Sequence, residues 1–269
     1  MKVICAENMG FCSGVKRAVD MALKQKDAFV LGQLIHNPQV VEMLDKKGIK
    51  EISSVDDIEK GSLIITAHGT TKSNVEKAKI KGLKIIDTTC PLVKKVQDLA
   101  KEFSSKGYDI ILFGDKGHSE VKGIVSNAEN IIVISSKEDA KNVFVKKACL
   151  LSQTTQSIEK FNEISKVLKS NVNELKIINT ICNATKKRQD SAMNIAKKVD
   201  IMIVIGGYNS ANTKRLNEIC SKITETKHIE TTREIKKEWF QGKKSVGITA
   251  GASTPDFVIK EIKKKIESL

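Results

Sequence analysis

One cysteine-centred pattern occurs three times in this chain, and it restricts the possible folds more than any other feature. The pattern reads Cys, two residues, Val or Thr, Lys, a basic residue, two residues, Asp. Its copies begin at Cys12, Cys90 and Cys182, which stand 78 (90−12) and 92 (182−90) residues apart. Self-similarity at such a spacing indicates a repeated structural unit with one cysteine at an equivalent place in each copy.

Each repeated cysteine is preceded by signs of a strand and followed by signs of a helix. Short apolar runs at residues 2–5, 83–86 and 175–178 come before the three cysteines, and such runs are typical of buried strands. Apolar residues at helical spacing follow each cysteine. We therefore expect each cysteine in a turn from strand to helix. In open α/β sheets this edge binds ligands, and the helix N-terminus there favours a thiolate.

Two further polar segments recur in each copy, each after another expected strand. In the first segment a polar residue stands nine positions after an aspartate in all three copies: His36 after Asp27, His118 after Asp109 and Asn209 after Asp200 (36−27, 118−109, 209−200). The second segment is a polar loop at the end of each copy. The sequence thus predicts the α/β class, with three similar lobes in a pseudo-threefold arrangement that brings the cysteines to one centre. The polar residues expected around this centre are His36, His68, His118, Glu120, Thr154, Asn209, Ser210, Asn212 and Ser253.

Three convergent cysteines leave three interpretations open. Three thiolates and a histidine can close a structural zinc site, although zinc ligands usually come in closely spaced pairs and this chain has no Cys-x-x-Cys. An iron-sulfur cluster accepts ligands from distant segments, and with three cysteines one iron stays open. The third interpretation is three buried structural thiols. The remaining cysteines, Cys5, Cys149 and Cys220, lie in apolar or helical stretches and are expected to be small core residues.

The polar residues around the expected centre offer hydrogen-bond donors suited to a phosphate or diphosphate group. They include three of the four histidines, and nearby Gly206, Gly207 and Gly251 would let the backbone approach an anion. The phosphate signal is weak by itself, because no Walker pattern or G-x-G-x-x-G is present. Glu120 is the only acid of the set and a candidate proton donor. An exposed loop carboxylate is the alternative interpretation of this residue.

The chain is basic, with a formal net charge of +14. Its lysines are spread along the expected helices, and aromatic residues at 4% offer little for stacking on bases. Solvated helix faces explain the charge better than a nucleic-acid groove, and a basic surface could equally attract an acidic protein or a phosphorylated substrate. A nucleic-acid-binding protein with structural cysteines stays the non-enzymatic alternative. The sequence lacks a signal-peptide pattern and any apolar run near the ~18 residues of a membrane span, so we expect a cytoplasmic protein.

Seven short motifs are specific in combination. They are Gly10-Phe-Cys-Ser-Gly-Val, His36-Asn-Pro, Ala67-His-Gly, Asp87-Thr-Thr-Cys-Pro-Leu-Val, Gly117-His-Ser-Glu, Ser152-Gln-Thr-Thr and Thr249-Ala-Gly-Ala-Ser-Thr-Pro-Asp. With them the chain resembles, over essentially its whole length, the 4-hydroxy-3-methylbut-2-enyl diphosphate reductase family, which acts last in the non-mevalonate isoprenoid pathway. The resemblance implies a 4Fe-4S cluster held by Cys12, Cys90 and Cys182, with one open iron. It also implies lobes at 12–90, 91–180 and 181–269, the last completed by a strand from residues 1–11.

The resemblance further implies a role for each polar residue. A small allylic diphosphate would be bound by His36, His68, His118, Thr154, Asn209, Ser210, Asn212 and Ser253. Glu120 would protonate the substrate, and Thr154 would orient its alcohol and relay the proton, with His118 beside them. The implied reaction is a two-electron reductive dehydroxylation to isopentenyl and dimethylallyl diphosphate, with the alcohol at the open iron and reduced ferredoxin or flavodoxin as electron donor. A cluster-dependent hydro-lyase is the alternative reaction. Ala211 departs from the family, in which many members carry serine there.

Overall fold

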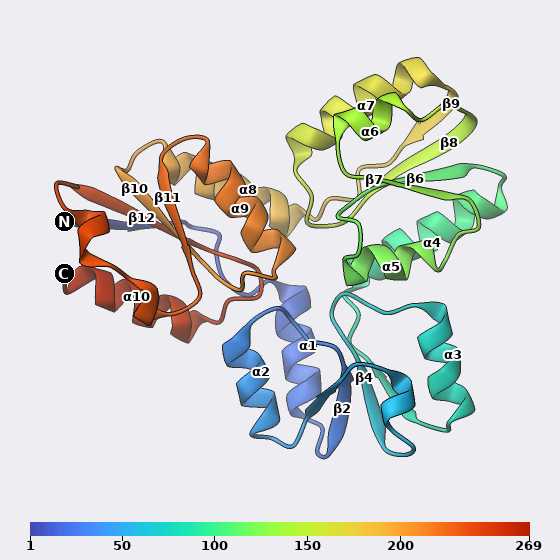
Figure 1. Cartoon of the computed structure of the whole chain (residues 1–269), viewed down its shortest axis with the longest axis horizontal. Helices are drawn as coiled ribbons and strands as arrows, with labels where there is room; N and C mark the ends of the chain where they lie inside the picture. Colours follow the sequence, from blue (N-terminus) through green and yellow to red (C-terminus); the bar gives the residue numbers. More distant parts are fainter. The chain divides into compact units, whose positions relative to one another are not determined.

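A computed structural model describes all residues from 1 to 269. Twelve strands form three separate four-stranded sheets, and every strand pair is parallel. The chain divides into two compact units, and Figure 1 draws their helices and strands with the labels used below. Unit 1 comprises Met1–Lys16, Ile35–Glu42 and Asn183–Leu269, and unit 2 comprises Arg17–Leu34 and Met43–Cys182. No helix combines the length and the apolarity that crossing a membrane requires.

Unit 1 contains one sheet with the strand order β1-β12-β10-β11. Its strands are β1 (Lys2–Cys5), β10 (Ile201–Ile205), β11 (Glu225–Ile229) and β12 (Ser245–Ala250), and its helices are α8 (Asn183–Ala196), α9 (Ala211–Ser221) and α10 (Asp256–Glu267). Successive side chains of β10 point to opposite faces. Ile203 packs in the cluster that contains Ile262 of α10, whereas Met202 packs in the cluster that contains Leu216 of α9. Helices on both faces explain why β10 is buried along its whole length.

Unit 2 contains the other two sheets, and the first has the strand order β3-β2-β4-β5. Its strands are β2 (Ala28–Leu31), β3 (Lys50–Ile52), β4 (Ser62–Ile65) and β5 (Lys84–Asp87). Helix α3 (Lys72–Ile80) connects β4 to β5. Leu63 of β4 and Ala78 of α3 are buried in one cluster beside the short helix η1 (Val55–Asp57). The boundary between the two units falls within α1 (Ser13–Leu23) and α2 (Pro38–Asp45).

The second sheet of unit 2 has the strand order β7-β6-β8-β9. Its strands are β6 (Asp109–Phe113), β7 (Ile131–Ile134), β8 (Val145–Ser152) and β9 (Val172–Ile177), and its helices are α4 (Pro91–Ser105), α5 (Ser119–Val125), α6 (Lys137–Lys141) and α7 (Ile158–Asn171). Along β8, Leu150 packs in the cluster of Phe161 on α7, and Leu151 packs in the cluster of Val121 on α5. The sheet therefore has a separate apolar core on each face.

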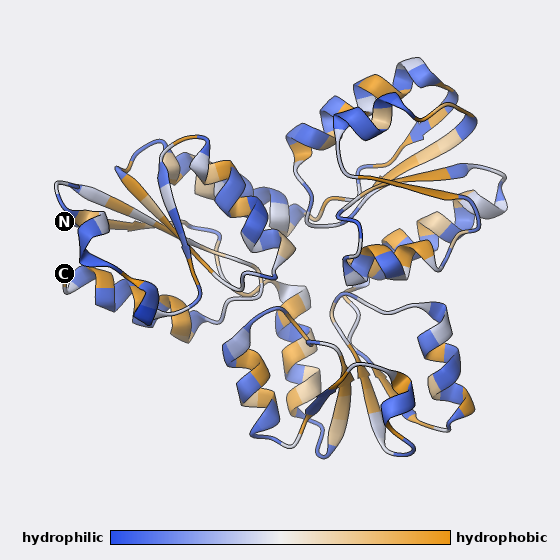
Figure 2. Cartoon of the chain, viewed as in Figure 1, coloured by the Kyte–Doolittle hydropathy of each residue, from blue (hydrophilic) through white to orange (hydrophobic).

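The predicted fold class is confirmed, because each of the three lobes has a parallel four-stranded sheet with helices between its strands. Figure 2 shows the hydrophobic residues concentrated in the inner strands of each sheet. Such continuous apolar strands are typical of parallel sheets that are covered on both sides. The first strand pairs with β12, 243 residues along the chain (Lys2 with Ser245, 245−2). Parallel strands place all their carboxyl ends at one edge of their sheet, and the candidate site residues follow these ends.

Candidate functional site

All three repeated cysteines stand at the start of a helix and are only partly exposed. Cys12 directly precedes α1, Cys90 caps α4 with Pro91 as the first helical residue, and Cys182 directly precedes α8. The sulfur of Cys12 accepts a hydrogen bond from the backbone N–H of Val15 at 3.4 Å. A cysteine at a helix start lies beside backbone N–H groups that have no partner within the helix, and its sulfur can serve as a metal ligand.

The same backbone hydrogen bond fixes each of these cysteines. The N–H of the cysteine donates to a carbonyl in a polar loop that follows a strand of the same unit. The pairs are Cys12 with Ala252 at 3.3 Å, Cys90 with Ala67 at 3.0 Å and Cys182 with Thr154 at 2.9 Å. Each cysteine is therefore tied to a loop that carries another candidate residue, Ser253, His68 or Thr154.

The other cysteines differ from these three. Cys149 and Cys220 are fully buried, and burial raises the pKa of both thiols to about 12. Cys5 is partly buried against the core of unit 1, and burial raises its thiol pKa too. All three thiols are therefore held in the neutral form, as expected for small core residues.

Glu120 is a buried acid on the first turn of α5, with 1% of its surface exposed. Its carboxyl group accepts two hydrogen bonds from Thr154, one from the backbone N–H at 2.6 Å and one from the hydroxyl at 2.9 Å. Burial raises the pKa of Glu120 to about 7 against the opposing effect of these bonds, and the charge of Asp115 adds to the rise. A carboxyl group that is partly protonated near neutral pH can donate a proton.

Two histidines of unit 2 lie together, and one of them contacts this acid. His118 caps α5, because its Nδ1 accepts the backbone N–H of Glu120 at 3.1 Å. His68, in the loop after β4, meets the ring of His118 edge to face with the centroids 5.3 Å apart. Accepting at Nδ1 leaves the neutral His118 ring with its proton on Nε2, which can then donate to a ligand.

Unit 1 brings together a second group of candidate residues. Ser210 caps α9 by accepting the N–H of Thr213 at 3.3 Å. The hydroxyl of Ser253 donates to the backbone carbonyl of His36 at 3.2 Å and lies 3.4 Å from that of Ser210. Burial and the nearby Lys214 lower the pKa of His36. Asn209 directly precedes Ser210 in the sequence but is exposed.

Asn212 has two buried polar atoms that are available to a ligand in unit 1. This side chain is 4% exposed, yet neither its amide nitrogen nor its oxygen has a hydrogen-bond partner. Buried polar groups almost always have partners, so this pair is suited to bind a polar group of a ligand or a water. Gly207 packs directly against the carbonyl of His36, and an added Cβ would lie 2.4 Å from that oxygen. A glycine is therefore required at position 207, because its backbone touches the backbone of His36 beside these residues.

Several residues that support the site were not predicted. Tyr208 donates its backbone N–H to the carboxylate of Glu230 at 2.6 Å and its hydroxyl to Glu234, and Gln39 donates to the carbonyl of Glu230 at 3.0 Å. In unit 2, the Arg17 guanidinium donates to the carbonyls just before Cys90. Arg17 is the basic residue of the repeated pattern, so the sequence contained a signal for it. No sequence pattern near Tyr208 indicates its partners Glu230 and Glu234.

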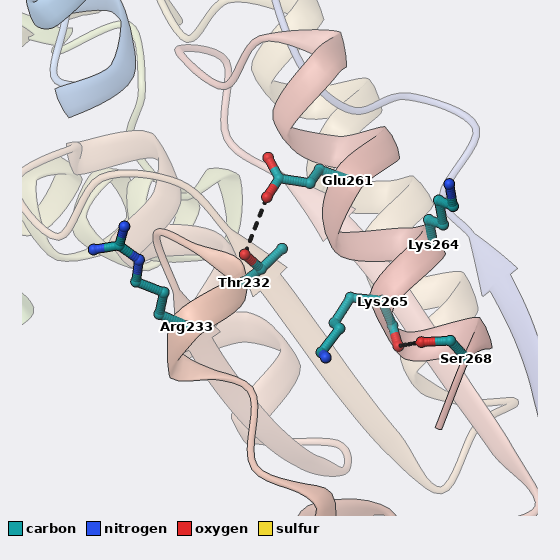
Figure 3. Close-up of a pocket in the computed structure, with 6 residues that line it drawn as sticks. All are labelled: Thr232, Arg233, Glu261, Lys264, Lys265 and Ser268. Atoms are coloured by element: carbon teal, nitrogen blue, oxygen red, sulfur yellow. Dashed lines mark hydrogen bonds between the residues drawn. The ribbon is translucent and has the colours of Figure 1, made fainter.

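A groove of about 470 Å³ lies elsewhere in unit 1, between α10 and the short helix η2 (Thr232–Glu234). Figure 3 shows that its basic side chains diverge, with Arg233 and Lys264 extending away from one another. The hydroxyl of Thr232 already donates to Glu261 at 3.1 Å. Charges that diverge do not converge on a ligand, so this groove is not the candidate site.

Comparison with known proteins gives one consistent result. The sequence model of the family described as LytB protein matches residues 3–267. Two curated relatives named 4-hydroxy-3-methylbut-2-enyl diphosphate reductase come from Caldanaerobacter subterraneus (48% identical, covering 100% of this chain and 98% of the relative) and Geobacter sulfurreducens (46% identical, covering 99% and 97%).

Two solved structures of reductases are also similar. One is the E-1-hydroxy-2-methyl-but-2-enyl-4-diphosphate reductase of Plasmodium falciparum, with a TM-score of 0.94, 30% identity and coverage of 100% of this chain and 87% of the other. The other is described as (E)-4-hydroxy-3-methyl-but-2-enyl diphosphate reductase, the terminal enzyme of the non-mevalonate pathway. It has a TM-score of 0.70, 41% identity and full coverage of both chains.

Proposed function

The chain belongs to the LytB family, and on that premise we propose that it reduces 4-hydroxy-3-methylbut-2-enyl diphosphate to isopentenyl and dimethylallyl diphosphate. The predicted family and the predicted enzyme class, a reductase of isoprenoid synthesis, are confirmed by these matches. In the proposed reaction the allylic C–O bond breaks, two electrons and two protons are taken up, and the hydroxyl group leaves as water.

The observation that carries this proposal is the buried pair of Glu120 and Thr154. Loss of hydroxide from an alcohol needs a proton, and Glu120 can hold one because burial raises its pKa to about 7. The 2.9 Å hydrogen bond between the carboxyl group and the Thr154 hydroxyl gives the proton a path. We propose that Glu120 is the proton source, that Thr154 relays the proton and orients the alcohol, and that His118 assists beside them.

We propose that Cys12, Cys90 and Cys182 hold a 4Fe-4S cluster at the centre of three lobes, 12–90, 91–180 and 181–269, the last completed by residues 1–11. Support comes from their shared position at helix starts, their matched backbone anchors and their partial exposure, which contrasts with buried Cys149 and Cys220. When bound, such a cluster supplies the electrons and an iron with an open coordination position.

We propose that the diphosphate is bound by His36, His68, His118, Asn209, Ser210, Asn212 and Ser253. The unsatisfied amide of Asn212 supports this, as does the hydroxyl pair of Ser210 and Ser253 near the N-terminus of α9. A neutral His36 donates one N–H, and a bound diphosphate would favour its protonated form. Because Ala211 has no hydroxyl group, Ser210 is the only serine in the run from Asn209 to Asn212.

A reduced ferredoxin or flavodoxin is the proposed electron donor. The net charge of +14 favours association with such acidic proteins through long-range attraction. We also propose a cytoplasmic location, because the electron donor and the allylic diphosphate substrate would both be present in that compartment.

The test is anaerobic incubation of the reconstituted protein with the substrate and a dithionite-reduced mediator. We expect isopentenyl and dimethylallyl diphosphate to form only when reductant is present, in protein that contains iron and sulfide. Glu120→Gln should retain iron and sulfide and lose turnover. Product that forms equally well without reductant would identify a hydro-lyase instead. Absence of iron and sulfide in active protein would overturn the cluster.

A further inference from the structure

Two loops of the second sheet of unit 2 are joined by a pair of hydrogen bonds that the reaction does not itself require. One loop follows β6 and the other follows β8. The side chain of Gln156 donates to the carboxylate of Asp115 at 3.0 Å, and the backbone N–H of Asp115 donates to the side chain of Gln153 at 2.9 Å. Gln153 is completely buried and Gln156 is 1% exposed. Buried polar contacts of this kind hold a specific geometry, because breaking one leaves a desolvated group without a partner.

The joined loops carry the two halves of the proton path. The loop after β6 leads to His118 and Glu120, and the loop after β8 contains Thr154. Their separation is also set by packing at Gly114, where an added Cβ would lie 2.7 Å from Val121 and 3.3 Å from the Gln153 side-chain oxygen. Nothing larger than hydrogen fits there, so the two loops are held in close contact.

Resting on the proposed function, we propose that Asp115 is a positioning residue for the proton donor. Through Gln153 and Gln156 it holds the Thr154 loop at hydrogen-bonding distance from Glu120, and it presents a negative charge to that acid. Asp115 thus has two separable effects, a mechanical one through its hydrogen bonds and an electrostatic one through its charge.

The surroundings of Glu120 make the electrostatic effect measurable. The negative charge of Asp115 raises the pKa of Glu120 in addition to the larger effect of burial, whereas the two hydrogen bonds from Thr154 lower it. His118 and Thr154 contact Glu120 as hydrogen-bonding partners. The rest of α5 packs in an apolar cluster with α4, β6 and β8, represented by Val96, Leu112 and Leu151. Removing the charge of Asp115 would therefore lower the pKa of Glu120 and shorten the pH range over which it holds a proton.

Two substitutions separate the two effects. Asp115→Asn keeps an oxygen that can accept from Gln156 and removes the charge, whereas Gln156→Leu removes the hydrogen bond and keeps the charge. Glu129→Gln, an exposed carboxylate of the same lobe, is the matched control. All variants are purified and reconstituted anaerobically, and iron and sulfide content, kcat, KM and the pH profile of kcat are measured with the allylic diphosphate and a reduced mediator.

For Gln156→Leu we expect kcat to fall about tenfold or more, with KM and cluster content nearly unchanged, because misplacing a reacting group by 1 Å can cost about 100-fold. For Asp115→Asn we expect most of kcat to survive at acidic pH, and the alkaline fall of kcat to move to lower pH. Wild-type kcat and pH profiles in both variants would overturn the proposal. A fall in kcat for both without any difference in pH profile would also overturn it, since it would reveal only a structural role.

Hydrogen exchange gives a readout that does not depend on activity. The N–H of Thr154 is donated to Glu120, so its exchange reports directly whether the loop is in place. We expect faster exchange at Thr154 in Gln156→Leu than in Asp115→Asn and the control. If wild-type protein fails to reduce the diphosphate, the proposed function fails while this exchange difference still supports the positioning. Equal exchange in all variants would refute the positioning whatever the activity.

Discussion

Replacing Glu120 by glutamine tests whether the buried carboxyl group really holds a proton near neutral pH. Glutamine has the same shape as protonated glutamate at this site. Its oxygen can accept the N–H of Thr154, and its NH₂ group can donate to the Thr154 hydroxyl, in place of the two contacts at 2.6 and 2.9 Å. The substitution therefore removes the ionisation and preserves the hydrogen bonding.

The size of the effect follows from the pKa. Glu120 titrates at about 7 in the folded chain, against 4.5 for an unperturbed glutamate. The folded state then binds the proton more tightly, so the free energy of unfolding falls as pH rises through this window. At about 1.4 kcal/mol per pH unit, the loss is on the order of 3 kcal/mol above pH 7. Glu120→Gln carries no such loss and should stay within about 1 kcal/mol of wild type near pH 5.

The assay is urea unfolding of wild type, Glu120→Gln and the control Glu129→Gln from pH 5 to pH 9. All three proteins are prepared anaerobically with the same metal content. The difference between Glu120→Gln and wild type should grow from about 1 kcal/mol or less at pH 5 to about 3 kcal/mol above pH 7, in favour of the variant, on the basis of the linkage above. Subtracting wild type cancels the histidines, whose shifts are common to both proteins. Parallel stability curves would refute a proton on Glu120, and a difference of opposite sign would show a carboxylate that is stabilised in its charged form.

The other predictions concern single contacts. Cys90→Ser should lose iron and sulfide while its circular dichroism is unchanged, because the anchoring bond to Ala67 uses only backbone atoms; full metal content would contradict the ligand assignment. Thr154→Val should keep the metal and lower kcat about 100-fold or more, since it removes the hydroxyl 2.9 Å from Glu120; a near-normal kcat would exclude the relay. Gly207→Ala would place a Cβ 2.4 Å from the carbonyl of His36, a cost of about 1–3 kcal/mol, and should raise KM about tenfold; an unchanged KM would remove this contact from the diphosphate site.

The sequence was a good guide to the fold because the lobes repeat and their strands are buried on both faces. The aspartate that starts the second strand of each copy is followed by an uninterrupted apolar run, as in β6 and β10. The strand at residues 175–178 was predicted and overlaps β9, but the burial predicted for it was wrong, because β9 is an edge strand and is mostly exposed. The pairing of β1 with β12 has no local signal at all, because it joins segments 243 residues apart (245−2).

Burial and long-range polar contacts were the parts of the site that the sequence could not supply. Glu120 was open to interpretation as an exposed loop carboxylate, yet it is 1% exposed, because the loop after β8 closes over it. The contacts of Asp115 with Gln156 and of Tyr208 with Glu230 join single polar residues from separate loops. Such pairs follow no periodicity, so only the folded chain identifies them.

The three repeated cysteines share one kind of backbone anchor, while the loops that anchor them carry different side chains. Each is anchored by its own backbone N–H to a carbonyl in the adjoining loop, and a carbonyl is available whatever the side chain. The geometry of the cysteine is thereby independent of the loop sequence. The loop side chains were then free to differ, and they became His68 in one copy, Thr154 in the next and Ser253 in the third. The proposed cluster ligands would thus share one geometry while their neighbours differ, which suits a site proposed to bind an anion and to deliver a proton.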